Sequence, residues 1–314
     1  MVSKKAIGIS AGVVVVAIII TVSVWRPSTE GGTIFEDTVE PMITYEPVLS
    51  VQGYEVSGSW TRSASSFPEY RSTINCIISN TGNAVAENVN FEIRVDGNLV
   101  VTQLYESVPA QGSESYVNAV TTSYDSSRTI EVKTWCSESS DVYTFYVEHD
   151  FPRYWSQDPD ILKLFIMPNE FSVAYRENQI VENKFFITAN WMAIRDWVGN
   201  SIEYVTDGAG HGERDYWQFP SETMNRGTGD CEDFSILLCS LLRANDWAPN
   251  EVYVVIGTTG DSCHAWVKID MGILGWYHLE PQAGSWGLIG DIGLWLRGYD
   301  DVYQFNDVYC EKVQ

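Results

Sequence analysis

The sequence predicts three parts in order: an N-terminal transmembrane helix, an all-β sandwich and a mixed α+β domain. Three observations support this fold class. Residues 6–25 are apolar and free of charge, residues 46–150 contain short alternating runs between turn signals, and helical and strand-like runs follow one another after residue 151. The 314 residues, 45% of them hydrophobic, are enough to bury one or two ordinary cores.

The N-terminal run has the length of a membrane span. Its roughly twenty residues would make a helix of about 30 Å, the thickness of a bilayer core. The run lacks a small-residue cleavage site of the Ala-x-Ala kind, so residues 1–26 are predicted to be a short cytoplasmic tail and an uncleaved signal-anchor. Because Lys4 and Lys5 precede the run, we expect a single-pass cell-membrane protein with its N-terminus in the cytoplasm and its domains outside.

The charge of the chain restricts its partners. Forty-two acidic residues against nineteen basic ones give a formal net charge of -23. Such a surface repels nucleic acid, so we expect no nucleic-acid partner. A protein or peptide substrate at the cell surface is compatible with this charge, although the charge itself identifies none.

Residues 27–45 are rich in Pro, Gly, Thr and Glu and are predicted to be a stalk linker. The sandwich is predicted over residues 46–150, where Asp96-Gly97 between two alternating runs is a strong hairpin signal. Residues 78–84 and 89–97 resemble the CARDB type of immunoglobulin-like adhesion module, which implies a spacer or binding role. Cys76 and Cys136 lie in strand-like stretches of this region, and we expect them to form a disulfide, because the extracytoplasmic compartment is oxidising. The pairing of the other cysteines is left open.

In the C-terminal domain, residues 151–314, apolar residues at helical spacing predict an amphipathic helix over residues 180–199. Cys231 is predicted to open a second helix, because Phe234 and the leucines after it recur at i, i+3, i+4, i+7 and i+8. A helix N-terminus stabilises a thiolate. The neighbouring Asp230, Glu232 and Asp233 oppose that effect, so an imidazolium partner is required for an activated thiol.

His264 is the best candidate for this partner. It opens an alternating run over residues 264–269 that is typical of a strand, and a second run over residues 275–281 contains Glu280. If the two strands are neighbours, Glu280 can accept a hydrogen bond from the imidazole and fix its tautomer. The alternative base, His278, would then lack an orienting partner.

Residues 216–223, 229–233, 264–266 and 279–281 resemble, in order and spacing, the transglutaminase-like superfamily, especially its bacterial and archaeal cysteine proteinase branch. The resemblance implies a papain-like α+β fold and a triad of Cys231, His264 and Glu280. The family usually has Asp at the third position, where this chain has the longer Glu280. The resemblance also implies an oxyanion donor upstream of the cysteine, for which Trp217 is preferred over Gln218.

No cofactor is required by this chemistry, but some relatives in that branch depend on calcium held by acidic residues around the nucleophile. Asp230, Glu232 and Asp233 match in type, and carboxylates suit this hard cation. The alternative is that Asp230 caps the helix while the other two complement its dipole. Peptide hydrolysis is the favoured activity. Acyl transfer by a transglutaminase reaction and a non-catalytic surface adhesion scaffold are the alternatives.

Overall fold

The computed structural model describes residues 9–10, 44–124, 126–185, 189–260, 262–282 and 299–313. The chain divides into two compact units. Unit 1 consists of Met1–Gly58, Ser72–Thr122 and Ser126–Glu148, and unit 2 consists of Ser59–Arg71, Ser123–Asp125 and His149–Gln314.

The predicted membrane anchor and stalk lie almost entirely outside the described residues. From the anchor the structure describes only Ile9–Ser10, the strand β1, which pairs with β8 (Ser140–Glu148). Within the described ranges, no helix has both the length and the apolar character that a membrane crossing needs. The anchor, the stalk and the orientation in the membrane stay predictions.

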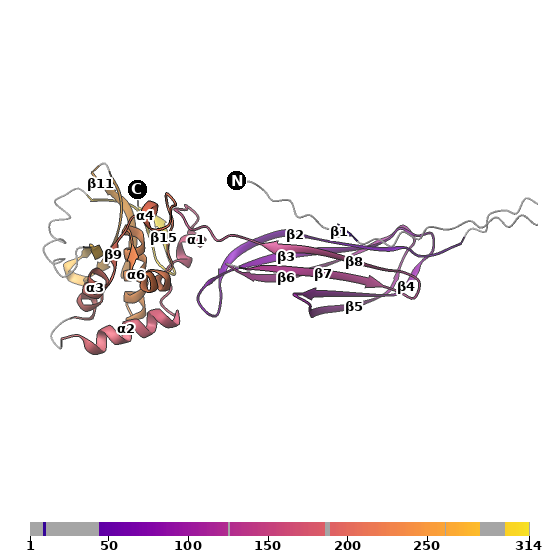
Figure 1. Ribbon diagram of the computed structural model, residues 1–314, viewed down its shortest axis with the longest axis horizontal. Helices are drawn as coiled ribbons and strands as arrows, with labels where there is room; N and C mark the ends of the chain where they lie inside the picture. Colours follow the sequence, from indigo (N-terminus) through magenta and orange to yellow (C-terminus); the bar gives the residue numbers. More distant parts are fainter. Residues whose placement is uncertain are drawn as a thin grey trace, which may run out of the picture. The chain divides into compact units, whose positions relative to one another are not determined.

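Unit 1 is a β-sandwich of two sheets (Figure 1). The other strands of the sandwich are β2 (Leu49–Arg62), β3 (Pro68–Asn80), β4 (Ala86–Val95), β5 (Asn98–Val108), β6 (Ser113–Ser123) and β7 (Ser127–Trp135). One end of β2, of β3 and of β6 falls within Ser59–Arg71 or Ser123–Asp125 and so belongs to unit 2. One sheet has the order β1-β8-β7-β4-β5, and the other has the order β2-β3-β6. Every second side chain of β3 from Ser72 to Asn80 is buried, as expected for a strand with one face on a core. The predicted β region is confirmed, including the hairpin at Asp96-Gly97, where both residues have positive φ.

The predicted disulfide between Cys76 and Cys136 is wrong. All six cysteines lie in the described residues and all are thiols. Cys76 is fully buried in the middle of β3, whereas Cys136 follows the end of β7 in the other sheet, in a turn that its amide closes by donating to Ser139 O at 2.8 Å. The strand patterns place each cysteine near a strand but do not specify whether two positions face each other across the sandwich.

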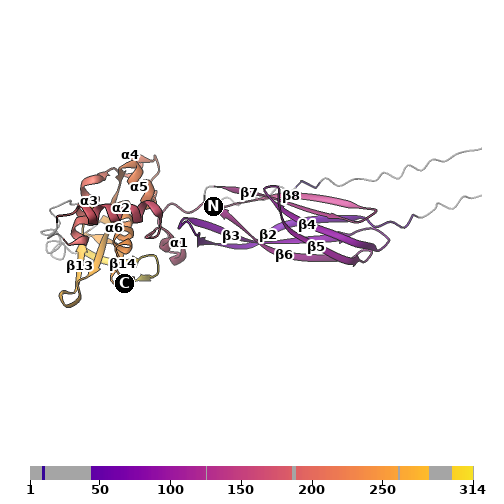
Figure 2. The ribbon, with the colours of Figure 1, turned by 90° about the horizontal axis from the view of Figure 1, so that it is seen from below.

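Unit 2 is the α+β part (Figure 2). Its helices are α1 (Pro159–Leu164), α2 (Phe171–Asn183), α3 (Asn190–Ser201), α4 (Asp207–Gly210), α5 (Pro220–Arg226) and α6 (Cys231–Ala244), with a short 3-10 turn, η1, at Gly272–Leu274. Its strands are β9 (Glu203–Tyr204), β10 (Thr228–Gly229), β11 (Val252–Thr259), β12 (Ser262–Asp270), β13 (Trp276–Leu279), β14 (Tyr299–Phe305) and β15 (Cys310–Lys312). The larger sheet has the order β13-β12-β11-β14-β15, and the smaller sheet pairs β9 with β10.

Helix α6 is the centre of unit 2. It packs on β11 and β12 and also on α2, α3 and α5. Residues Phe234–Leu242 are all buried, so the helix is surrounded by protein on more than the single face that the apolar spacing predicted. This position fixes the first turn of α6 against the sheet.

The single helix predicted over residues 180–199 is wrong in its bounds. The chain forms two helices there, because Lys184 leaves the helical conformation with φ -68° and ψ 156°, and α3 begins only at Asn190. Trp191, Ile194 and Val198 are buried on one face of α3, as the spacing predicted. Apolar periodicity therefore located the buried face but not the break, since Val181 and Trp191 continue the pattern on both sides of it.

Candidate active site

Cys231 is the first residue of α6, as predicted, and its thiol lies against the sheet. The backbone amide of Ala265 on β12 forms a hydrogen bond with its sulfur. The helix start is reached through Gly229, where an added Cβ would lie 2.7 Å from the Cβ of Asp233. A glycine at this position therefore allows Asp233 to fold back over the start of the helix, where its Oδ2 accepts from the amide of Asp230 at 3.3 Å.

His264 and Glu280 are brought together by two neighbouring strands. β12 and β13 are antiparallel with Val267 opposite Leu279, and Glu280 directly follows β13. The Nε2 of His264 lies 2.8 Å from Glu280 Oε2, with the two side chains 18% and 12% exposed. This hydrogen bond occupies Nε2 and leaves Nδ1 as the ring nitrogen available to a thiol.

Aromatic side chains support the back of this pair. The hydroxyl of Tyr299 donates to Glu280 Oε2 at 3.4 Å, and its ring packs edge-on against Trp266 with centroids 4.9 Å apart. The indole of Trp266 in turn donates to Nδ1 of His278 at 2.7 Å. Burial lowers the pKa of His278. His278 is thus engaged with its strand neighbour, while His264 faces the cavity described next.

Cys231 and His264 line one cavity of about 310 Å³. The other lining residues are Trp155, Asp215, Trp217, Glu232, Ile256, Cys263 and Ala265. A small, mainly apolar pocket with a few convergent polar groups is typical of a ligand or substrate site. The cavity could admit part of an extended chain beside the thiol.

The two predicted oxyanion donors are already engaged. Trp217 is 3% exposed, and its indole donates to Asp215 Oδ1 at 2.9 Å. The side-chain amide of Gln218 donates to Asp233 and to Thr228 O. The role of Trp217 therefore stays a prediction. The backbone amide of Cys231, at the first position of α6, belongs to the amides that an α-helix leaves without an intrahelical partner.

An acidic cluster lies directly beside the nucleophile position. Carboxylate oxygens of Asp207, Asp230 and Asp233 lie within 4.8 Å of one another. Burial raises the pKa of Asp207 to about 6 and that of Asp233 to about 8, and the charge of Asp230 contributes to both shifts. One oxygen of Asp230, Oδ1, is buried and has no hydrogen-bond partner in the described part of the chain.

The role of Glu232 in holding calcium stays a prediction, and its neighbours differ from those of Asp233. Glu232 does not join Asp230 and Asp233 in one converging set; instead, its carboxylate groups either with Asp230 and Cys231 or with Asp207 and Asp215. The thiol of Cys231 donates to Glu232 Oε2 at 3.1 Å. Burial is the largest cause that raises the pKa of the Cys231 thiol, and the neighbouring Glu232 carboxylate is the next largest. Burial also raises the pKa of Glu232.

Asp207 and Asp215 were not among the residues singled out from the sequence. Both come from the segment between β9 and α5, which the sequence analysis did not connect with the site. Asp207 is held in place because its Oδ2 accepts from the amide of Tyr216 at 2.6 Å. The only signal in the sequence was two acidic residues at the ends of a glycine-rich stretch, a pattern that also occurs in ordinary surface loops.

The class of the domain is given by comparison with known protein families. Residues 177–281 match the transglutaminase-like superfamily, so the chain contains a transglutaminase-like domain. This match covers about a third of the chain and includes Cys231, His264 and Glu280. A comparison with curated proteins gave no match.

Several solved structures are similar to parts of the chain. Calcium-bound LapG from Legionella pneumophila is 17% identical with a TM-score of 0.34, over 50% of this chain and 82% of that chain. A candidate protease from Parabacteroides distasonis is 10% identical with a TM-score of 0.27, over 74% of this chain and 70% of that chain. The CARDB domain of a Pyrococcus furiosus protein, in complex with di-metal ions, is 12% identical with a TM-score of 0.26, over 34% of this chain and 96% of that chain.

Proposed function

We propose that the protein hydrolyses peptide bonds through Cys231, with His264 as general base and Glu280 as the group that orients and stabilises the imidazole. The observation that carries the proposal is the convergence of Cys231 and His264 on one cavity while Glu280 holds the opposite nitrogen of the ring. A nucleophile, a base and an orienting acid in this relation are the minimum for covalent acyl chemistry.

In the proposed reaction, His264 Nδ1 takes the thiol proton as the sulfur of Cys231 attacks the amide carbonyl carbon. The negative charge that develops on the carbonyl oxygen can be met by the backbone amide of Cys231 at the start of α6. The imidazolium then gives its proton to the leaving amine as the C–N bond breaks, which leaves a thioester. Water, deprotonated by His264, attacks the thioester, and the sulfur leaves as the acid product is released.

The acidic cluster opposes formation of the thiolate unless a cation neutralises it. The residues fit a calcium ion, because Asp207, Asp230 and Asp233 supply convergent oxygens and Asp230 Oδ1 is buried without a partner. We propose that these three carboxylates hold the ion and that Glu232 contributes through its contacts with Asp207 and Asp230. The ion would supply positive charge that lowers the pKa of the neighbouring thiol.

The location of this activity follows from the predicted anchor. We propose that the catalytic unit is held outside the cell membrane by residues 6–25, with the sandwich as a spacer or binding module. Protease added to intact cells should then degrade the protein while a tag placed before residue 1 stays protected. Protection of both units from that protease would contradict this location.

The activity is tested by incubating the purified chain with a proteome-derived peptide library and calcium, and then sequencing the new N-termini by mass spectrometry. Wild-type protein should cut a defined subset of peptides, and Cys231→Ser and His264→Ala should not. If no peptide is cut more by wild type than by Cys231→Ser, peptide hydrolysis is wrong. Cross-linked peptides in place of cut ones would indicate that an amine resolves the thioester.

A further inference from the structure

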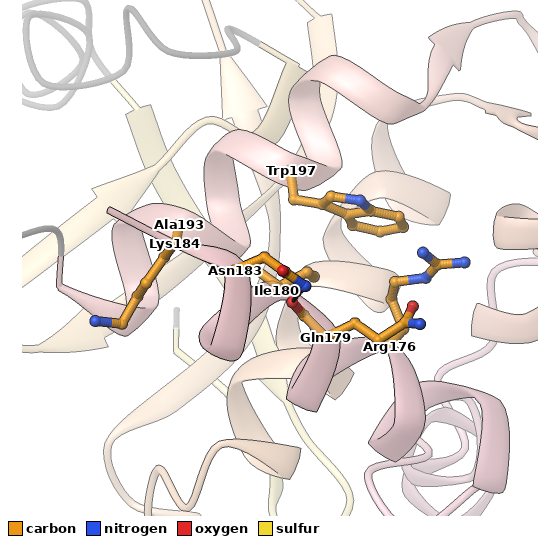
Figure 3. A pocket seen from close by; sticks show the side chains of 7 residues that line it. All are labelled: Arg176, Gln179, Ile180, Asn183, Lys184, Ala193 and Trp197. Atoms are coloured by element: carbon orange, nitrogen blue, oxygen red, sulfur yellow. Dashed lines mark hydrogen bonds between the residues drawn. The ribbon is translucent and has the colours of Figure 1, made fainter. Parts of the chain in front are cut away.

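A second cavity of unit 2 lies between α2 and α3, apart from the active site. It has a volume of about 400 Å³ and shares no lining residue with the cavity at Cys231. Its lining consists of Arg176, Gln179, Ile180, Asn183, Lys184, Ala193 and Trp197 (Figure 3). Four of these residues follow the i, i+3, i+4, i+7 spacing on α2, and the last two are four residues apart on α3, so each helix presents one continuous face.

Arg176 is the polar group that distinguishes this cavity. Its guanidinium lies over the ring of Trp197, 5.0 Å from the centroid, and Figure 3 shows the two groups facing each other. The Nε of Arg176 is buried and has no hydrogen-bond partner among the described residues. Lys184, at the other end of the cavity, extends away from Arg176 (Figure 3).

Arg176 has no ion-pair partner in the described part of unit 2. The chain has 42 acidic residues for 19 basic ones, and three other partly buried cations in the described part of unit 2 each have a carboxylate partner. The pairs are Arg153 with Glu222, Arg243 with Asp307 and Lys268 with Asp301, at distances of 2.7–2.8 Å. No carboxylate in the described ranges lies within ion-pair distance of Arg176. Because a buried donor without a partner is unfavourable, this position is suited to an acceptor that comes from outside the described structure.

We propose that this cavity, defined here as the Arg176 pocket, binds a carboxylate that is attached to a flat apolar group. The guanidinium fork matches a carboxylate in two parallel hydrogen bonds, and the indole of Trp197 beside it offers an aromatic surface that an apolar body can contact. Ile180 and Ala193 supply an apolar lining for that body. A single inward-facing guanidinium in a strongly acidic protein suits a singly charged group better than a phosphate dianion.

Such a carboxylate can come from a free aromatic acid or from an acidic side chain next to an aromatic one in a peptide. Equilibrium dialysis of the full-length chain in detergent distinguishes the sources. The probe for a free aromatic acid is 3-phenylpropionate, and 3-phenylpropionamide is its uncharged control. The peptide probe is acetyl-phenylalanyl-glutamate amide, with the corresponding glutamine peptide as its match. Binding of both acids indicates a site for the free carboxylate, and binding of the peptide alone indicates a site for a protein segment.

In either case the acid should bind at least about tenfold more tightly than its amide, and Arg176→Gln should remove that preference. Arg71→Gln, which removes an exposed guanidinium of the same unit, should change binding by less than about twofold. If Arg176→Gln does not fold, Arg176→Lys, which keeps the charge but loses the fork, and Trp197→Leu should each weaken binding of the acid. Equal binding of acid and amide, unchanged binding by the Arg176 variants, or no saturable binding of either acid below about 10 mM overturns the proposal.

Discussion

Replacement of Glu280 by glutamine removes one charge from the proposed triad with almost no change of shape. The His264–Glu280 hydrogen bond is 2.8 Å long, and both side chains are less than a fifth exposed. A hydrogen bond to a charged partner in such a setting contributes about 1.5–3 kcal/mol. Since about 1.4 kcal/mol corresponds to a factor of ten, Glu280→Gln should slow formation of the reactive thiolate by about 10- to 100-fold. Glu280→Ala, which also loses the orientation of the ring, should lie at or beyond the upper end of this range.

The assay is the second-order rate of Cys231 alkylation by iodoacetamide between pH 5 and 9 in the presence of calcium, with the modified cysteine mapped by mass spectrometry. Cys136, a partly exposed thiol of the sandwich, provides an internal reference in the same sample. Wild-type Cys231 should react faster than Cys136 at neutral pH and lose that advantage in the variants. Glu87→Gln, the same charge change on an exposed position of the sandwich, is the matched control. If Glu280→Ala alkylates at the wild-type rate, Glu280 does not support the base and the triad is wrong.

Three further predictions concern the metal, the sheet and pH. Chelation by EGTA should slow Cys231 alkylation and lower Tm. In Asp207→Asn, the alkylation rate and Tm should no longer depend on calcium. If this variant responds to calcium as the wild type does, the ion is bound elsewhere. Gly257→Ala should lower the free energy of unfolding by about 1–3 kcal/mol in urea melts, because the new Cβ would lie 2.1 Å from Asp300 O, while Gly208→Ala should not. Burial raises the pKa of Glu177, so ionisation of this carboxyl opposes folding. Glu177→Gln should therefore raise Tm at pH 7 and raise it less near pH 4. An equal rise of Tm at the two pH values would contradict this explanation.

The parts of the site that could be predicted from the sequence are those that lie on regular elements. The thiol of Cys231 is at a helix start because an apolar face begins three residues later, and His264 and Glu280 follow from strand alternation. These patterns are local, so each can be read from a few consecutive residues. The predicted β-sandwich followed by an α+β unit depended on the same patterns.

What could not be predicted depends on contacts between distant segments. Asp207 reaches the cluster from a segment without periodicity, and only the folded chain shows that it joins Asp230 and Asp233 while Glu232 turns toward the thiol. The wrong disulfide has a similar cause, because strand patterns do not specify which residues of two sheets face each other. The break at Lys184 was missed because the apolar spacing continues across it.

The register of β12 determines where the chain tolerates insertions and deletions. β12 is an interior strand. Its His264 lies opposite Gly257 of β11 on one side, and its Val267 lies opposite Leu279 of β13 on the other. Deleting one residue within it would turn His264 to the opposite face of the sheet. The connection between Thr259 and Ser262 lies outside that constraint, because the register of β11 and β12 is set by the residue pairs from Val252 with Ile269 to Thr259 with Ser262. Insertions between Thr259 and Ser262 should therefore be the easiest way to fuse a new recognition loop at the edge of the catalytic cavity.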